Sequence, residues 1–236
     1  MMPPVVILTG GLATRLYPVT LKIPKSLIQV AGKPFIFHQL ALLKRQGVCN
    51  VLLCVGKFGE KIQEYVGDGH AWGLNAQYSY DGETLLGTGG AIKKAIQLLP
   101  EIFFVLYGDS YLDVDLKPIL EHFESEGKPA LMTVYHNKNK WDKSNILFRD
   151  GRVVKYDKKN MMSEMEHLDY GINILRKTTL NDWPDGTPFD LSEVFTKLIE
   201  KGEVSAFEVF TRFYEIGSIQ GIKETEQYLN CSVSFM

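Results

Sequence analysis

Short apolar runs alternate with amphipathic stretches along the first 136 residues of the chain. Apolar runs that end at a glycine or a polar residue predict buried strands, over residues 5–9, 50–55, 75–80, 103–107 and 130–136. Apolar residues at helical spacing predict helices between them, over residues 34–45, 58–66, 91–99 and 116–126. This alternation predicts an α/β fold with a mostly parallel, doubly wound, Rossmann-like central sheet and helices on both faces.

The pattern changes after residue 136. Asp150-Gly151 lies between two apolar stretches and predicts a β-hairpin. Further strands are predicted over residues 168–175, 204–210 and 213–217, and helices over residues 190–201 and 219–229. The strand at 168–175 is interrupted by Gly171, and Asp190 and Glu193 have the spacing of a capping box. These segments predict a small β-rich insertion followed by a closing helix.

Composition narrows the class of protein without pointing to a function. The 236 residues are 45% hydrophobic, which suffices for one sizeable core, so we expect a single domain over residues 1–236. A net charge of −2 gives no support to a nucleic-acid-binding surface. The sequence shows no signal peptide and no apolar run near the ~20 residues that span a bilayer. We therefore expect a cytoplasmic protein that binds neither nucleic acid nor membrane.

The loop over residues 10–25 is long for a compact domain, and such loops are usually functional or disordered. It begins with Gly10 and Gly11 and carries Arg15 and Lys25. Glycine lets backbone N–H groups approach phosphate oxygens, and both cations can bind them. The chain has no Walker A run and no dinucleotide fingerprint after its first strand, so ordinary kinases and nicotinamide enzymes lose support. We predict a different polyphosphate loop, with a surface loop of solvated cations as the alternative.

Acidic residues near predicted strand ends are candidate metal ligands. Asp109 follows a buried aromatic-rich strand, and one carboxylate plus substrate phosphates is a typical Mg²⁺ site. Glu215 is a candidate second ligand, or else an exposed charge at a strand end. Asp113 and Asp115 form a DVD triplet that can ligate a metal, although Asp115 is favoured as a helix N-cap. Lys158 is a candidate phosphate contact, or else a solvated lysine.

The stretch GGLATRLYPVTLKIPKSLIQVAGKP closely resembles GGxxTRLxPxTxxxPKxLxxVxGKP, the signature of sugar-1-phosphate nucleotidylyltransferases. LLGTGGAI, YGDSYL, VVKYDKK, LDYGIN and FYEIGS follow in the order of that family, so the resemblance covers nearly the whole chain. LGTGGAI is most similar to the short branch that includes D-glycero-D-manno-heptose 1-phosphate guanylyltransferase. Mannose-1-phosphate guanylyltransferase and N-acetylmuramate-1-phosphate uridylyltransferase are similar too. The chain ends soon after FYEIGS, so we expect no β-helix domain.

The resemblance implies a reaction in which an NTP and a sugar 1-phosphate give an NDP-sugar and pyrophosphate. The sugar phosphate attacks directly in line, with Mg²⁺ as cofactor and no protein nucleophile. Catalysis then consists of positioning and charge neutralisation. By analogy, Arg15 holds the leaving phosphates, Lys25 lies near the reacting phosphorus, and Asp109 and Glu215 bind Mg²⁺. Arg15, Lys25 and Asp109 are the expected catalytic residues.

The resemblance also implies two binding subsites. The expected nucleotide-binding residues are Leu8, Thr9, Gly10, Gly11, Thr14, Arg15, Gly87, Thr88, Gly89 and Asp109. The expected sugar-phosphate-binding residues are Lys158, Gly171 and Asn173. The domain then divides into a nucleotide-binding half over residues 1–135, a sugar-phosphate-binding half over 136–217, and a closing helix and tail over 218–236.

Two positions depart from the family pattern: Ala13 replaces a glycine, and Glu215 stands where many relatives have Asp. The longer Glu215 side chain would alter the geometry at a metal. The expected substrates are GTP and heptose or mannose 1-phosphate, with UTP or CTP and another sugar phosphate as the alternative. The oligomeric state is open, and a homo-oligomer is one outcome. The competing functions are a DxD glycosyltransferase that uses Asp113 and Asp115, and a catalytically silent sugar-nucleotide-binding subunit.

Overall fold

The computed structural model describes residues 1–11 and 16–233, which form two compact units. The first unit comprises Met1–Leu85, Leu106–Asp113 and the segment from Phe213 onward, and the second comprises Leu86–Val105 and Val114–Arg212. The predicted division by function, at residues 135 and 217, stays a prediction. No helix among the described residues is both long and apolar enough to cross a membrane.

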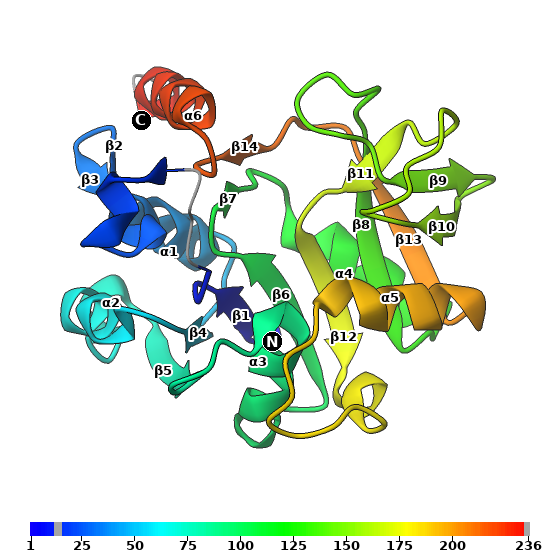
Figure 1. Ribbon diagram of the computed structural model, residues 1–236, viewed down its shortest axis with the longest axis horizontal. Coiled ribbons are helices and arrows are strands. Elements are labelled where there is room, and N and C mark those ends of the chain that lie inside the picture. The colour runs from blue at the N-terminus through cyan, green and yellow to red at the C-terminus, as the bar shows by residue number, and fades with distance from the viewer. Residues whose placement is uncertain (12–15, 234–236) are drawn as a thin grey trace. The chain divides into compact units, whose positions relative to one another are not determined.

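The first unit is built on parallel strands in the order β1 (Val5–Leu8), β4 (Asn50–Val55) and β5 (Asn75–Tyr80). Val5 pairs with Val51, and Asn50 pairs with Asn75. Every residue of β4 after Asn50 is buried, as expected of a strand covered on both faces. Figure 1 shows these three strands side by side, with α2 (Gly59–Val66) next to β5. The parallel arrangement predicted for these strands is confirmed.

The other elements of the first unit are α1, two short antiparallel pairs and a C-terminal helix. The pairs are β2 (Gln29–Val30) with β3 (Lys33–Pro34), and β7 (Ser110–Tyr111) with β14 (Tyr214–Glu215); the helices are α1 (Phe35–Arg45) and α6 (Ile219–Val233). The helix predicted from residue 34 begins at Phe35, because Pro34 pairs with Gln29 in β3. The strand predicted over 213–217 is only β14, and the closing helix is longer than predicted.

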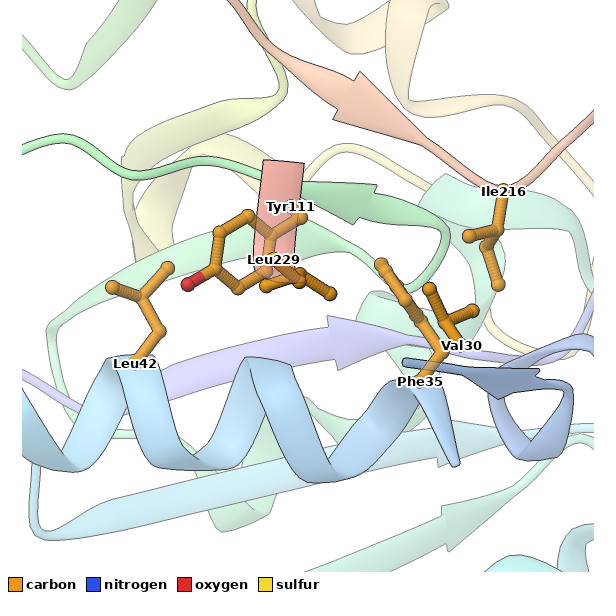
Figure 2. Close-up of a cluster of buried hydrophobic side chains, with 6 residues drawn as sticks. All are labelled: Val30, Phe35, Leu42, Tyr111, Ile216 and Leu229. Carbon is orange, nitrogen blue, oxygen red and sulfur yellow. The ribbon is translucent and has the colours of Figure 1, made fainter. Parts of the chain in front are cut away.

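A buried apolar cluster joins segments of the first unit that lie far apart in sequence. It consists of Val30, Phe35, Leu42, Tyr111, Ile216 and Leu229. Figure 2 shows these side chains converging from β2, α1, β7, α6 and the end of β14. Burying each such side chain stabilises the fold by about 1.5–3 kcal/mol. The cluster therefore fixes the β7–β14 pair, which begins beside Asp109.

The second unit contains a mixed sheet around β8 (Ala130–His136). The other strands are β6 (Ile102–Tyr107), β9 (Ile146–Arg149), β10 (Arg152–Tyr156), β11 (His167–Asp169), β12 (Ile172–Arg176) and β13 (Val204–Val209). The first four residues of β6 belong to this unit and its last two to the first unit. β11 and β12 run antiparallel to β8, and β13 runs parallel to it. The predicted hairpin is present as β9 and β10, which meet at Asp150-Gly151.

Three helices of the second unit are α3 (Gly87–Ala95), α4 (Leu116–Glu126) and α5 (Leu191–Glu200). Asp115 caps α4 by accepting a 3.0 Å hydrogen bond from the N–H of Lys117, as favoured from the sequence. The predicted capping box of Asp190 and Glu193 is also confirmed. The interruption predicted at Gly171 is confirmed, because Tyr170 and Gly171 separate β11 from β12. The predicted start of α3 was wrong, since the helix begins at Gly87 instead of residue 91.

Candidate functional site

The carboxyl ends of β1, β4 and β6 meet in the first unit. The N–H and the hydroxyl of Thr9 both donate to the carbonyl of Cys54 at 2.9 Å. The N–H of Gly108 donates to the carbonyl of Leu8 at 3.0 Å. Ligands of parallel α/β sheets bind at this edge. The structure therefore brings two of the predicted nucleotide residues, Leu8 and Thr9, next to Gly108 and so close to Asp109, whereas Thr14 and Arg15 lie outside the described residues.

Two glycines at this edge have different reasons to be glycine. A Cβ on Gly108 would lie 2.5 Å from the carbonyl oxygen of Leu8, so a side chain is excluded by the main chain of β1. A Cβ on Gly11 would have no described residue within 4 Å. Packing thus explains Gly108, whereas no described residue fills the position that a side chain on Gly11 would take.

Gly108→Ala is expected to lower the free energy of unfolding by about 1–3 kcal/mol, because the main chain must shift to admit the methyl group. Gly11→Ala is the matched control, since a methyl group there would meet no described residue within 4 Å, and its change is expected to be near zero. Denaturant unfolding of both variants measures the difference. Equal destabilisation of the two variants would contradict this account of the strand ends.

Lys25 and Asp109 form the central ion pair of this edge. Nζ of Lys25 lies 2.7 Å from Oδ2 of Asp109, and the side chains are 17% and 33% exposed. Lys25 opens a short 3₁₀ turn, Lys25–Leu27, whose backbone bonds run from Leu27 to Pro24 and from Ile28 to Lys25. The structure therefore joins two of the predicted catalytic residues that are 84 positions apart in sequence.

Gln39 holds the segment that carries Asp109 and was not predicted as a site residue. It lies on α1, is 1% exposed, and its Nε2 donates to the carbonyls of Tyr107 at 3.2 Å and Ser110 at 2.8 Å. A buried amide that bonds both ends of a turn restrains it, because leaving those carbonyls unpaired costs about 1–3 kcal/mol each. The signal in the sequence was a polar residue at a core position of an amphipathic helix.

Glu215 lies one strand away from Asp109, but its carboxylate has other partners. It pairs with Ser110 across β7 and β14, and the N–H of Ile216 donates to the carbonyl of Asp109 at 2.9 Å. The carboxylate itself accepts hydrogen bonds from the N–H of Gly217 and, at 2.6 Å, from the hydroxyl of Ser218. The backbones of the two predicted metal ligands are thus adjacent, while the Glu215 carboxylate points to the start of α6.

The donor chemistry at Asp109 fits a hard divalent cation. Its carboxylate offers oxygen ligands, and Oδ2 already accepts a cation in the form of the Lys25 ammonium. Within residues 1–11 and 16–233, no group of three or more His, Cys, Asp and Glu side chains is arranged to hold a metal. Mg²⁺ is commonly held by one or two carboxylates together with substrate phosphates. The residues present are therefore suited to a Mg²⁺ that phosphates help to bind.

Asp81 is a buried acid at the end of β5 that the sequence did not single out. It is 9% exposed, and its Oδ2 lies 3.3 Å from the position of a Cβ on Gly10. Burial, with a smaller contribution from the charge of Asp81, raises the pKa of the Cys54 thiol to about 12. A carboxylate thus lies beside the first glycine of the predicted nucleotide loop.

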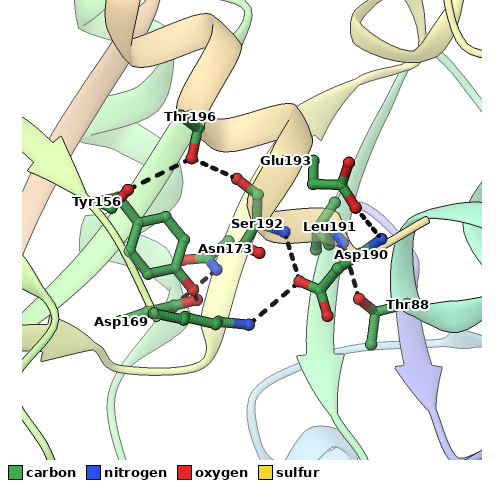
Figure 3. Close-up of polar contacts among 10 residues, drawn as sticks. Thr88, Tyr156, Asp169, Asn173, Asp190, Leu191, Ser192, Glu193 and Thr196 are labelled. Carbon is green, nitrogen blue, oxygen red and sulfur yellow. Dashed lines mark hydrogen bonds and ion pairs between the residues drawn. The ribbon is translucent and has the colours of Figure 1, made fainter. Parts of the chain in front are cut away.

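In the second unit, Gly87 and Gly89 form the first turn of α3 against the segment that precedes α5. A Cβ on Gly87 would lie 2.6 Å from the carbonyl oxygen of Phe189, and one on Gly89 would lie 2.3 Å from the Phe189 ring. The hydroxyl of Thr88 accepts a 2.8 Å hydrogen bond from the N–H of Leu191 (Figure 3). Packing within the unit therefore requires these residues, and their contact with a nucleotide stays a prediction.

Lys158 lies beside the N-cap of α5. Its Nζ is 3.2 Å from Oδ1 of Asp190, which also accepts from the N–H of Ser192 at 2.8 Å. Burial alone would raise the pKa of Asp190, but the Lys158 charge and the Ser192 hydrogen bonds outweigh it and lower that pKa. Lys158 also borders a groove of about 540 Å³ between β10 and α5, whose lining includes Lys155, Lys159 and Lys197. Lys158 thus lies at a concave part of the second unit, where its ammonium is paired with Asp190.

Asn173 belongs to a polar network around Asp169 (Figure 3), and Gly171 joins it through its backbone N–H. Oδ1 of Asp169 accepts from the N–H of Gly171 and from Nδ2 of Asn173, each at 3.0 Å. Asn173 is 1% exposed, and its carbonyl oxygen accepts from the N–H of Thr133 at 2.9 Å. Asp169 and Asn173 therefore hold the β11–β12 turn at Gly171, which has a φ of +102°.

Comparisons with known proteins agree with this geometry. The profile of the Nucleotidyl transferase family matches residues 4–145. D-glycero-alpha-D-manno-heptose 1-phosphate guanylyltransferase of Campylobacter jejuni is 32% identical over 214 residues, which are 90% of this chain and 93% of that protein. UTP–glucose-1-phosphate uridylyltransferase of Synechocystis is 28% identical over 83% of this chain, and the match spans only 55% of that relative.

A solved structure shows the same architecture. The crystal structure of HddC from Yersinia pseudotuberculosis has 26% sequence identity and a TM-score of 0.81, and the match covers 97% of this chain and 100% of that one. The same protein has been solved in complex with GMP-PN. This likeness confirms the prediction of a Rossmann-like α/β fold with a mixed, mostly parallel central sheet.

The family match covers more than half of the chain, and the Campylobacter relative is matched over nearly its full length. The chain therefore belongs to the nucleotidyl transferase family. The relatives named above are sugar-1-phosphate nucleotidylyltransferases, so the family inferred from the motifs is confirmed.

Proposed function

We propose that the protein is an enzyme that transfers a nucleotidyl group from an NTP to a sugar 1-phosphate, giving an NDP-sugar and pyrophosphate. The observation that carries the proposal is the Lys25–Asp109 ion pair at the strand ends of the first unit. A cation and a metal-type carboxylate beside an approachable glycine backbone suit a polyphosphate that reacts with a divalent metal. Family membership supplies the reaction class.

In this proposal the first unit provides the phosphate and metal contacts. In the first unit, Gly10, Gly11 and Arg15 bind the phosphates, and Lys25 neutralises charge on the reacting phosphate. Asp109 holds Mg²⁺, which supplies charge neutralisation on the phosphates when bound, and Glu215 is the candidate second ligand. Glu215 is the weaker candidate of the two ligands, because its carboxylate accepts hydrogen bonds from the N–H of Gly217 and from the hydroxyl of Ser218, the residue before α6.

The second unit supplies the sugar-phosphate contacts. Lys158 provides the cation for the phosphate, and the Gly171 turn provides backbone close to the sugar. Asn173 acts by holding that turn through Asp169. Gly87, Thr88 and Gly89 are proposed to line the base subsite.

We propose GTP as the donor and heptose or mannose 1-phosphate as the acceptor. The Campylobacter relative is named a heptose 1-phosphate guanylyltransferase, which supports this pair. Asp81 adds a physical reason for guanine. A carboxylate accepts hydrogen bonds only, and the guanine edge offers two adjacent donors, N1–H and N2–H, whereas uracil and cytosine offer no such pair. Location in the cytoplasm, absence of nucleic-acid and membrane partners, and assembly as a homo-oligomer remain expectations.

Asp81→Asn is expected to lower kcat/KM with GTP about 10- to 100-fold, because the amide presents a donor where the base needs an acceptor. The rate with UTP should change much less. Asp68→Asn, at an exposed acid paired with His70, is the matched control and should leave both rates unchanged. An equal loss with GTP and UTP would remove Asp81 from base recognition.

A pyrophosphate-release assay over a grid of NTPs and sugar 1-phosphates tests the function. Release that requires both substrates and a divalent metal supports it, and the best pair identifies base and sugar. Hydrolysis or transfer of an NDP-sugar without pyrophosphate release would instead support the DxD glycosyltransferase. Binding without any turnover would support a catalytically silent subunit.

A further inference from the structure

We propose that the Lys25 ammonium blocks the Asp109 carboxylate in the nucleotide-free protein by pairing with it. When nucleotide binds, Lys25 leaves Asp109 and pairs with the triphosphate instead; this change of partner is called the exchange. Asp109 is then open to a divalent cation only together with the nucleotide. The proposal rests on the function proposed above, and it gives Lys25 a second role besides charge neutralisation during the reaction. That role is to set the order in which metal and nucleotide bind.

The first support is that both predicted metal ligands already have partners. Oδ2 of Asp109 is 2.7 Å from the Lys25 ammonium, and both side chains are partly buried, which strengthens their attraction relative to an exposed pair. The Glu215 carboxylate accepts from the N–H of Gly217 and the hydroxyl of Ser218. A free divalent cation at Oδ2 of Asp109 or at the Glu215 carboxylate would therefore have to displace one of these partners. At Oδ1 of Asp109, which accepts a 3.4 Å hydrogen bond from the hydroxyl of Ser110, it would still meet the positive charge of Lys25 on the same carboxylate.

The second support is that two cations compete for one carboxylate. Among the described residues, Asp109 is the carboxylate with which Lys25 forms an ion pair. An ammonium that stays in place would repel a divalent ion at the same oxygen. A polyphosphate changes this balance, because it offers Lys25 other anionic oxygens and adds ligands for the metal. The metal–nucleotide complex therefore favours the movement of Lys25 away from Asp109. The metal alone does not, because it offers Lys25 no new anionic partner.

The third support is that the exchange needs only side-chain rotation. The backbone at Lys25 is fixed by the bonds of the 3₁₀ turn, from Leu27 to Pro24 and from Ile28 to Lys25, each at 3.0 Å. The segment around Asp109 is fixed by Gln39 and by the bond from Ile216. Lysine has a flexible four-carbon stem and a compact charge, so its head can move while its backbone stays in place.

Mn²⁺ binding, followed by the electron paramagnetic resonance signal of the free ion, tests the exchange on the full chain. Wild type is expected to bind Mn²⁺ at least about 10-fold more weakly alone than with a non-hydrolysable GTP analogue. Lys25→Met should bind Mn²⁺ without nucleotide at least about 10-fold more tightly than wild type. Lys25→Arg keeps the positive charge and should stay close to wild type.

Two controls keep the result interpretable. Lys25→Met/Asp109→Asn should lose the gain in Mn²⁺ affinity, which assigns the site to Asp109. Thermal melting shows whether each variant is folded, and the wild-type comparison with and without nucleotide needs no variant. Equal Mn²⁺ affinity of folded wild type and Lys25→Met, or tight wild-type binding without nucleotide, would overturn the exchange.

The outcome is independent of the pyrophosphate assay. Pyrophosphate release by wild type without a gain in Lys25→Met would leave the function intact and reject the exchange. A higher Mn²⁺ affinity of Lys25→Met, together with no turnover on any substrate pair, would support the blocking of Asp109 by Lys25 and reject the proposed reaction.

Discussion

Asp109→Asn is expected to lower turnover at saturating substrates by at least about 100-fold. The substitution removes the charge that a divalent cation and Lys25 both require, and loss of one preorganised electrostatic group commonly costs about 10²–10³ in kcat. The fold should persist, because Gln39, Ile216 and the β7–β14 pair bond the backbone of this segment and not its carboxylate. Steady-state kinetics with a Mg²⁺ titration measures the effect.

Asp115→Asn is the matched control for that variant. Asp115 caps α4, and asparagine is an equally good N-cap, so neither stability nor turnover should change appreciably. The control also separates the competing functions. In a DxD glycosyltransferase the triplet of Asp113 and Asp115 would hold the metal, and Asp115→Asn would then lose activity while Asp109→Asn retained it.

Lys25→Met is expected to lower kcat about 10²- to 10³-fold with a smaller change in KM for the sugar phosphate. In the proposed reaction, Lys25 neutralises charge that develops on the reacting phosphate, so its loss should act mainly on the transition state. Lys25→Arg should retain intermediate activity, because it keeps the charge but not the compact geometry. Initial-rate kinetics on purified variants gives both constants.

Lys22→Met provides the comparison on the same loop. Lys22 is exposed, and its backbone carbonyl accepts a hydrogen bond from Nζ of Lys61 at 2.7 Å. Its side chain should therefore be dispensable for turnover. Similar losses in Lys22→Met and Lys25→Met would indicate a diffuse effect of loop charge and would contradict a specific role for Lys25.

Local patterns located most elements of the fold. The apolar run at Val5–Leu8 and the capping box at Asp190 each carry their signal within a few residues, and both were found. The start of α3 was missed because Gly87 and Gly89 resemble a loop. Phe189, about 100 positions away, leaves no room for a side chain at either glycine. A local sequence pattern does not contain that contact.

The candidate site was predictable in its residue types and less so in its geometry. Lys25 and Asp109 were both named from motifs, but their ion pair depends on strand ends that meet only in the folded unit. Gln39 was not predicted, because its side chain donates to main-chain carbonyls of a distant segment. A helix pattern alone does not reveal such partners. The direction of the Glu215 carboxylate follows from the bonds that start α6, which residue type alone does not specify.

The way in which the C-terminal helix closes the first unit has a consequence for synthesis of the chain. Glu226 of α6 accepts a 3.0 Å hydrogen bond from the N–H of Ala31, and Leu229 completes the apolar cluster of Figure 2. β14 pairs with the residue that follows Asp109. During translation, the whole second unit is synthesised before these partners exist. The first unit is therefore begun first and completed last, and a nascent chain that stops short of α6 contains the proposed catalytic residues Lys25 and Asp109 but lacks the α6 contacts to Ala31 and to the apolar cluster.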